Sequence, residues 1–284
     1  MDVAIGLPNA VPNASGAELI EWARRAEARG FSSLGTIDRI VYPNYEPLTA
    51  LAAAAAVTER IGLCTTVLLA PLRTNPVELA KQALSLNALS GGRFTLGIGL
   101  GAREDDYAIS GVELKGRGKR LDEMLEQVKD VWDRGEVGPV SAGAPRLVLG
   151  GHADASFARA ARFGEGWVAG GSAPGEYAGM VEKLAAAWSA AGRDGSPRKM
   201  ALAYYSLGDN AAAEAHAYLT DYYAFLGEEI AGHIAAGAAQ DPGTVQQYVQ
   251  AFEAAGCDEL VLFPSASDPV QVDLLADAVG PALD

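Results

Sequence analysis

Short apolar runs and longer amphipathic stretches alternate along the whole chain. The apolar runs are rich in Val, Leu and Ile, and most are continuous, as is typical of parallel strands that are buried on both faces. We therefore expect eight strands, at residues 3–8, 32–37, 61–69, 93–100, 146–149, 166–169, 200–206 and 259–263.

Each expected strand is followed by a stretch with helical periodicity. In residues 17–29, for example, Leu19 and Ala23 fall on one helix face. Ser15 has the side chain that suits the N-cap of this helix. The remaining helices are expected at residues 46–60, 76–89, 118–134, 153–163, 174–191, 242–255 and 268–279, and residues 210–240 also have a helical pattern.

Eight strand–helix units without a Pro-rich or Ser-rich linker predict one domain over residues 1–284. The fold class is α/β, and the architecture is a (β/α)8 TIM barrel. A doubly wound sheet would also alternate strands and helices, but eight units in 284 residues without a linker favour the closed barrel. Two insertions, at about residues 102–117 and 208–241, each follow a strand. We expect both at the C-terminal mouth, where barrels of this kind hold their active sites.

Composition excludes several functional classes. The formal net charge of −14 disfavours a nucleic-acid partner, whose phosphates would be repelled. No uncharged apolar stretch is long enough to cross a bilayer, so no membrane partner is expected. Cys64 and Cys257 form no CxxC pair, which predicts a reducing, cytoplasmic location without a disulfide framework. The three histidines lie far apart in the sequence, and no metal site is expected.

Three runs of the sequence resemble the luciferase-like superfamily of oxidoreductases, which use FMN or the deazaflavin coenzyme F420. They are residues 31–60, 61–101 and 146–171, and the most specific piece is NALSGGRFTLGIGLG at residues 87–101. Residues 97–102, which overlap the end of that piece, also fit the GxGxxG/A pattern of a dinucleotide fold. Three strand–helix units precede it and a polar loop follows it, however, so the barrel is the better interpretation.

The resemblance implies a cofactor site made of residues at the ends of several strands. Thr66 and Val67 match the segment where the family places a non-proline cis peptide beneath the flavin ring, although an ordinary buried strand is the alternative. Glycines 150 and 151 open a turn into a helix whose free N–H groups would attract a phosphate, unless the turn is only structural. The full set of expected cofactor residues is Thr66, Val67, Arg120, Gly150, Gly151, His152, Ala153, Ser156, Gly170 and Gly171.

The expected catalytic residues follow the second and fourth strands. Asp38 matches a family acid close to the flavin or the substrate, but Arg39 stands where the family usually has His. Arginine cannot exchange protons near neutral pH, and would instead hold an anion through its planar fork of donors. A surface pair between Asp38 and Arg39 is the alternative. Asp106 and Tyr107 could reach a substrate, and Arg103 could pair with a ring carbonyl or a substrate acid, unless this loop is simply solvated.

These features predict an FMN-dependent monooxygenase that acts with O2 on a small organic substrate and receives reduced flavin from a separate reductase. A deazaflavin-dependent hydride-transfer enzyme is the first alternative, and a non-catalytic flavin-binding homologue is the second. A homodimer is expected from the resemblance alone. Tyr218, Tyr222 and Phe225 share one helix face, and could form a lid, part of a dimer interface or part of the core.

Overall fold

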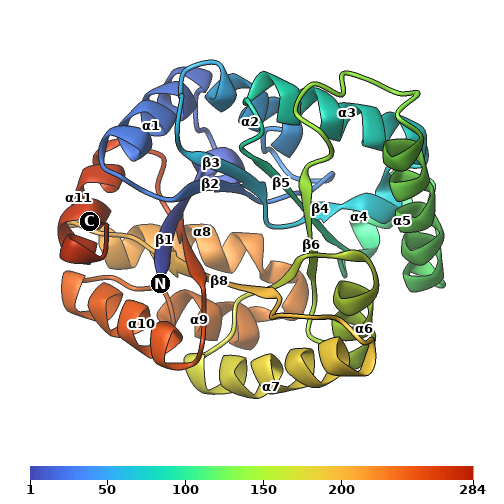
Figure 1. Ribbon diagram of the computed structural model, residues 1–284. Coiled ribbons are helices and arrows are strands. Elements are labelled where there is room, and N and C mark those ends of the chain that lie inside the picture. Colours follow the sequence, from blue (N-terminus) through green and yellow to red (C-terminus); the bar gives the residue numbers. More distant parts are fainter. Residues whose placement is uncertain (284) are drawn as a thin grey trace.

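The computed structural model describes residues 1–283, whose strands all belong to one parallel sheet. The strands are β1 (Asp2–Gly6), β2 (Ser33–Thr36), β3 (Gly62–Thr65), β4 (Leu68–Leu69), β5 (Phe94–Gly99), β6 (Arg146–Gly150), β7 (Gly166–Ala169), β8 (Arg198–Tyr205) and β9 (Glu259–Pro264). The sheet runs in the order β3-β2-β1-β9-β8-β7-β6-β5-β4, and β3 also pairs with β5. The two ends of the sheet therefore meet, and the predicted (β/α)8 barrel is confirmed (Figure 1).

One predicted strand is interrupted. The prediction of a continuous strand over residues 61–69 is wrong, because the chain leaves the sheet at Thr66 and Val67. These two residues are joined by a cis peptide bond, as the family resemblance implies. The pieces on either side, β3 and β4, both pair with β5, so they act together as one of the eight staves of the barrel.

Helices surround the barrel (Figure 1). They are α1 (Gly16–Ala28), α2 (Pro47–Ala55), α3 (Pro76–Leu89), α4 (Glu104–Ile109), α5 (Arg117–Arg134), α6 (Asp154–Phe163), α7 (Pro174–Ala190), α8 (Ala211–Tyr222), α9 (Glu228–Ala236), α10 (Pro242–Ala254) and α11 (Val270–Val279). Ser15 caps α1 as predicted, in a capping box with Glu18. The polar loop expected after β5 contains α4, which is too short to show helical periodicity in the sequence.

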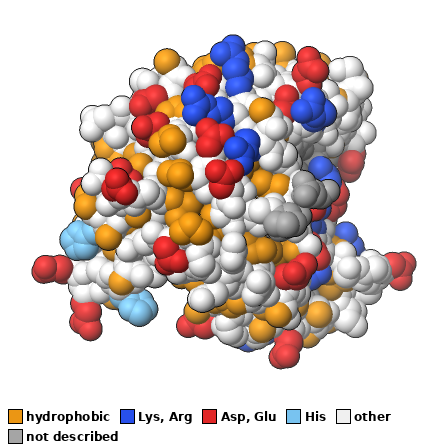
Figure 2. Space-filling model, turned by 90° about the vertical axis from the view of Figure 1, so that its left-hand side faces the viewer, with side chains coloured by type: hydrophobic (Ala, Val, Ile, Leu, Met, Phe, Trp, Pro, Cys, Tyr) orange, Lys and Arg blue, Asp and Glu red, His pale blue; other side chains and the backbone are white. Residues whose placement is uncertain are grey.

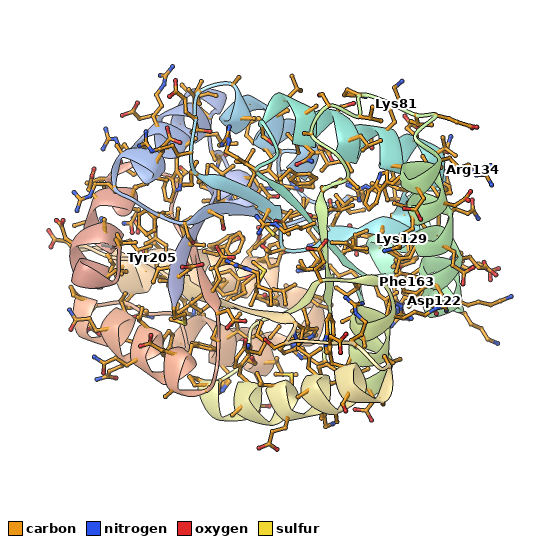
Figure 3. All side chains as sticks on the ribbon, in the orientation of Figure 1. Lys81, Asp122, Lys129, Arg134, Phe163 and Tyr205 are labelled. Carbon is orange, nitrogen blue, oxygen red and sulfur yellow. The ribbon has the colours of Figure 1, made fainter. Side chains whose placement is uncertain are left out.

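Apolar side chains fill both faces of the sheet. Val3 and Ile5 pack outward among the helices, whereas Ala4 belongs to a second buried cluster with Leu202 and Tyr204 of β8. Leu202 and Tyr204 also line a pocket at the mouth, which places this second cluster inside the barrel. Figure 3 shows the interior crowded with side chains, while charged groups on the outer helices point away from it. This two-sided burial explains the continuous apolar strands.

The surface matches the acidic composition. Figure 2 shows acidic side chains scattered over the whole face that it presents, in keeping with the formal net charge of −14. Within residues 1–283, no helix has the length and apolar character needed to cross a membrane.

The glycine-rich end of β5 serves the packing of the neighbouring stave. The Thr65 hydroxyl donates to the Gly97 carbonyl at 2.7 Å and accepts from the Gly97 amide at 2.9 Å. A Cβ atom at Gly97 would overlap the Thr65 carbonyl oxygen, and one at Gly99 would overlap a Val67 methyl group. The glycines that imitate a dinucleotide motif in the sequence thus allow close approach between strands.

Replacing Gly97 by Ala tests this packing. Gly97→Ala should lower the free energy of unfolding by about 3 kcal/mol, because the added methyl group meets backbone that cannot move aside. Gly179→Ala is the matched control, since Gly179 lies in α7 with open space around its Cβ position. That control should gain about 0.5–1 kcal/mol from helix propensity. Urea unfolding followed by circular dichroism measures both, and equal stability of the two variants would contradict the packing account.

Candidate functional site

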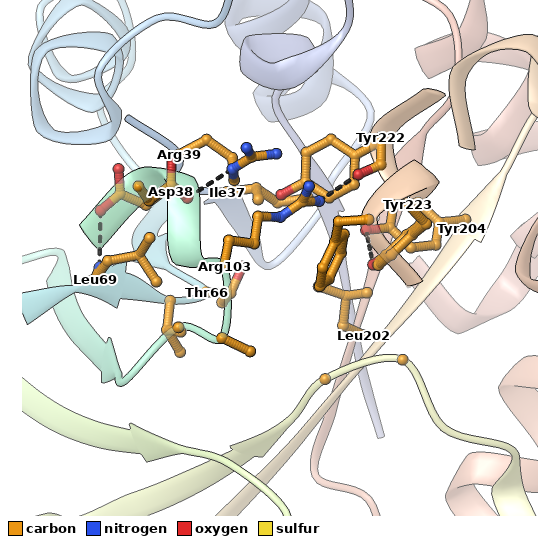
Figure 4. Close-up of a pocket in the computed structure, with 17 residues that line it drawn as sticks. Ile37, Asp38, Arg39, Thr66, Leu69, Arg103, Leu202, Tyr204, Tyr222 and Tyr223 are labelled. Atoms are coloured by element: carbon orange, nitrogen blue, oxygen red, sulfur yellow. Dashed lines mark hydrogen bonds and ion pairs between the residues drawn. The ribbon is translucent and has the colours of Figure 1, made fainter. Parts of the chain in front are cut away.

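A pocket of about 190 Å³ opens at the C-terminal mouth of the barrel (Figure 4). Its walls come from the ends of β2, β5, β7 and β8, from the break between β3 and β4, and from both insertions. Most of the lining is apolar or aromatic. The lining residues are Ile37, Asp38, Arg39, Thr66, Val67, Leu69, Gly101, Ala102, Arg103, Asp106, Gly170, Gly171, Leu202, Tyr204, Tyr222, Tyr223 and Phe225.

Thr66 and Val67 form one wall of this pocket. The Val67 side chain lies between the backbones of two neighbouring strands, because a Cβ atom at Gly150 would come within 2.7 Å of one of its methyl groups and a Cβ atom at Gly99 would overlap the other. Thr66 is buried, and its hydroxyl donates to the Thr36 carbonyl at 3.3 Å. The wall is therefore fixed by packing, and its predicted contact with a cofactor ring stays a prediction.

Asp38 is buried at the end of β2, where its carboxylate has two partners. Oδ2 accepts from the Leu69 amide at 2.8 Å and from the Arg73 guanidinium. Oδ1 is buried without a partner in residues 1–283. Burial raises the pKa of Asp38 above its ordinary value, although Arg73 and the amide oppose this. The alternative of a surface pair with Arg39 is wrong. Arg73 was missed, because nothing in the sequence marks an arginine in a distant loop.

Arg39 pairs with Asp106 instead. Its Nε donates to Asp106 Oδ2 at 2.7 Å, and its Nη2 donates to the Val41 carbonyl at 3.0 Å and to Asp105 at 3.1 Å. Asp106 Oδ1 accepts from the amides of residues 40 and 41, at 2.9 and 2.7 Å. Asp106 thus joins α4 to the segment after β2 and fixes the direction of the Arg39 guanidinium. Asp106 and Arg39 both reach the pocket as predicted, but as a bound pair.

Arg103 lies across the middle of the pocket opening (Figure 4). Its Nη2 donates to the Tyr222 carbonyl, and its guanidinium carbon lies 4.6 Å from the Tyr222 ring centroid and 3.9 Å from that of Phe225. The arginine therefore fastens the end of α8 to the loop after β5. Burial lowers the pKa of Arg103 below its ordinary value.

The aromatic residues of the second insertion divide between pocket and core. Tyr222 and Phe225 line the pocket, and Tyr218 and Tyr222 are both buried in the cluster inside the barrel. The Tyr223 hydroxyl lies 2.8 Å from the Tyr204 hydroxyl at the pocket wall. The prediction that all three residues share one helix face is wrong, because α8 ends at Tyr222 and Phe225 lies in a short 3-10 helix after it. The core role is confirmed for Tyr218 and Tyr222, and the lid and the dimer interface stay predictions. Tyr204 and Tyr223 were missed, since neither stands out in the sequence pattern.

The predicted phosphate turn is compact. Gly151 has a φ of +131°, and a Cβ atom there would overlap the Ser156 hydroxyl. Ser156 is buried in the first turns of α6, and its amide donates to the Ala153 carbonyl at 2.7 Å. His152 is exposed beside Gly170, whose Cβ position lies 3.6 Å from the His152 Nε2 atom. The structure thus brings two of the predicted glycine turns together.

Two predicted site residues have other partners. The Arg120 guanidinium donates to the carbonyls of Glu113 and Lys115, and holds the loop before α5. No described contact joins it to residues 150–156, so its reach to a phosphate stays a prediction. Tyr107 is buried beside Leu69, and its hydroxyl donates to a backbone carbonyl. This place in the core gives Tyr107 a packing role instead of the expected contact with a substrate.

The residues present suit a flat ring with a phosphate tail. The pocket offers apolar walls for a ring, and two buried polar atoms that have no partner within residues 1–283, Asp38 Oδ1 and Arg39 Nη1. Such unsatisfied groups in a cavity are typical of a site that a ligand completes.

Comparison with known proteins assigns the family. A family model described as luciferase-like monooxygenase matches residues 1–259. The chain belongs to this luciferase-like family. Among curated relatives, it is 34% identical over 201 residues to an uncharacterized protein of Mycobacterium tuberculosis, covering 58% of this chain and 69% of that protein. It is 30% identical over 143 residues to an F420-dependent glucose-6-phosphate dehydrogenase of Kribbella flavida, covering 47% of this chain and 43% of the enzyme.

A solved structure supports the same fold. The monooxygenase RslO1 from Streptomyces bottropensis superposes with a TM-score of 0.81 at 22% identity, covering 98% of each chain. Because the family model covers most of the chain, this chain is a luciferase-like oxidoreductase.

Removing the charge of Asp106 tests its ion pair with Arg39 at the mouth of the barrel. Asp106→Asn should lower the free energy of unfolding by about 3 kcal/mol, because the buried Arg39 guanidinium loses its carboxylate. Asp130→Asn removes an exposed carboxylate from an i,i+4 pair with Arg134, and should change stability by about 0.3–0.5 kcal/mol. Urea unfolding of both variants measures the difference. An Asp106 variant as stable as the control would show that the Arg39–Asp106 pair does not stabilise the fold.

Proposed function

We propose that this luciferase-like enzyme holds its cofactor ring in the pocket at the mouth, against Thr66 and Val67. The observation that carries the proposal is the agreement between the expected ring position and the pocket, whose walls also include Gly170 and Gly171. In this arrangement the phosphate lies at the turn into α6, where Gly151 and the buried Ser156 offer close backbone and a hydroxyl. The substrate is a small organic molecule that enters from the Arg39 side.

We infer that hydride transfer with coenzyme F420 is the first candidate for the reaction. The named dehydrogenase of Kribbella flavida supports this choice at the level of sequence. When bound, a deazaflavin donates a hydride to a substrate carbon or accepts one from it. The oxygen on that carbon must then gain or lose a proton. Asp38 suits the proton step, because its Oδ1 atom is unpartnered at the pocket and burial raises the pKa of its carboxyl group. This scheme does not need the histidine that the family usually has at the position of Arg39.

An FMN-dependent monooxygenase is the second candidate. The family description and the Streptomyces bottropensis monooxygenase favour it, as do the apolar and aromatic pocket walls, which exclude water from a site that activates O2. This reaction needs reduced flavin from a separate flavin reductase. A homodimer remains part of the proposal for either reaction.

Titration of the purified protein with each coenzyme tests the proposal. If F420 is the coenzyme, we expect it to bind at least about tenfold more tightly than FMN. This ratio of dissociation constants corresponds to about 1.4 kcal/mol of binding free energy. Absorbance and fluorescence changes measure the binding. The reverse preference, together with O2 consumption by the reduced-flavin complex, supports the monooxygenase. Failure to bind either coenzyme overturns the proposed function.

A pair of glycine variants locates the ring. Gly171→Trp should weaken coenzyme binding at least about tenfold, because the indole would occupy a pocket wall that has open space at this position. Gly175→Trp, at an exposed position in α7 with equally open space, should leave binding unchanged. Thermal unfolding confirms that both variants are folded. Equal affinities in the two variants would place the coenzyme elsewhere.

Substitution of Asp38 tests the proton step. Asp38→Asn should lower the rate of carbonyl reduction about 100-fold, because the amide cannot supply the proton. Coenzyme affinity should change less than about threefold, since the loss lies in the chemical step and not in binding. Burial raises the pKa of Asp38, so the wild-type rate should fall as the pH rises through a value above the ordinary 3.8. A variant that keeps the wild-type rate and pH profile would exclude Asp38 as the proton donor.

A further inference from the structure

Two arginine side chains reach the pocket with donors that the protein itself leaves unused. Arg39 comes from the segment after β2, and Arg103 from the loop after β5. Figure 4 shows the two guanidinium groups on the same side of the pocket, next to Tyr222. Both lie within 6 Å of the Tyr222 ring centroid, at 5.6 Å for Arg39 and 4.6 Å for Arg103. A ligand beside that ring would therefore meet both cations.

The Arg39 guanidinium is fixed in place, and one of its nitrogens is free. Its side chain is only 4% exposed, and its Nε and Nη2 atoms are bound to Asp106, Asp105 and a carbonyl. The Tyr42 ring lies 5.3 Å from the guanidinium carbon and limits its movement further. Nη1 is buried without a partner in residues 1–283. A buried charged donor without an acceptor is costly in free energy. A ligand that accepts a hydrogen bond from Nη1 would remove that cost.

Arg103 is held by a backbone carbonyl and two aromatic rings. Among residues 1–283, its described partners are the Tyr222 carbonyl and the rings of Tyr222 and Phe225, and no carboxylate forms an ion pair with it. The two carboxylates that line the pocket form ion pairs with other arginines, Asp38 through Oδ2 with Arg73 and Asp106 with Arg39. Of the two arginines that line the pocket, Arg103 is thus the one that forms no ion pair within residues 1–283.

The position of these cations separates them from the expected phosphate turn. Residues 150–156 are not among those that line this pocket, and they begin at the end of β6. The remaining walls beside the two arginines are the apolar and aromatic groups of Leu202, Tyr204 and Tyr222. A ligand that suits both features carries an anionic group at one end and an apolar body at the other.

We propose, on the basis of the oxidoreductase function proposed above, that the substrate is an organic acid whose carboxylate binds Arg39 Nη1 and the Arg103 guanidinium. The planar fork of arginine matches the two oxygens of a carboxylate, and the aromatic walls hold the body of the acid. Arg103 also fastens the Tyr222 end of α8, so the anion binds where the second insertion closes over the pocket.

Calorimetric titration of the purified chain without added coenzyme tests this proposal directly. The probes are phenylacetate, the neutral and nearly isosteric phenylacetamide, and inorganic phosphate. We expect phenylacetate to bind at least about tenfold more tightly than phenylacetamide, and inorganic phosphate not to compete with it at equal concentration. Equal affinity for the acid and the amide overturns the proposal. Displacement of the acid by phosphate assigns the cations to the coenzyme tail and also overturns it.

Arginine variants show which side chains are responsible. Arg103→Met should reduce the preference for the acid over the amide to less than about threefold, and Arg103→Lys should keep part of it, because the charge remains and the fork is lost. Arg134→Met is the control, since Arg134 is exposed on α5 and paired with Asp130, and its preference should equal that of the wild type. A preference that survives in the folded Arg103→Met protein overturns the assignment.

The coenzyme titration keeps this inference separate from the proposed function. A chain that binds F420 or FMN but does not distinguish the acid from the amide retains its proposed function and loses the inference. A chain that distinguishes the acid from the amide but binds neither coenzyme retains an anion pocket, and loses both the proposed function and the identification of the acid as its substrate.

Discussion

The carboxylate of Asp106 is the constraint on which the shape of the mouth depends. It accepts from one guanidinium and two backbone amides, and so ties α4 to the segment after β2. Without this tie the Nε atom of Arg39 would lose its carboxylate partner in the pocket wall. A short helix in an insertion thereby positions a side chain that follows a different strand of the barrel. In this way a rigid sheet can support a variable site at its mouth.

The second constraint lies in the wall of the barrel. Val67 is accommodated because β5 and β6 have glycines where it approaches, and Thr65 approaches β5 closely for the same reason. The backbone around the expected ring position is thus held by packing on both sides. One side of the mouth is the segment Thr66–Val67, which the neighbouring strands hold in place. The other side is the end of α8, which Arg103 holds through the Tyr222 carbonyl.

Periodicity was enough to predict the architecture, because buried parallel strands and amphipathic helices leave strong patterns in the sequence. It could not predict the break at Thr66 and Val67, whose residues are as apolar and β-branched as their neighbours. Only the family resemblance indicated that break. The short helix α4 was missed because it has too few residues to show a period.

The site was predictable in its location more than in its partners. Asp38, Arg39 and Asp106 follow strands, and therefore had to meet at the mouth. Which carboxylate pairs with which arginine depends on side-chain geometry that spacing does not contain, so the Arg73 partner of Asp38 could not be foreseen. A crystal structure with bound F420 or FMN tests the central claim most directly. The account predicts the ring against Thr66 and Val67 with its phosphate at Ser156, and a ring bound outside this pocket would contradict it.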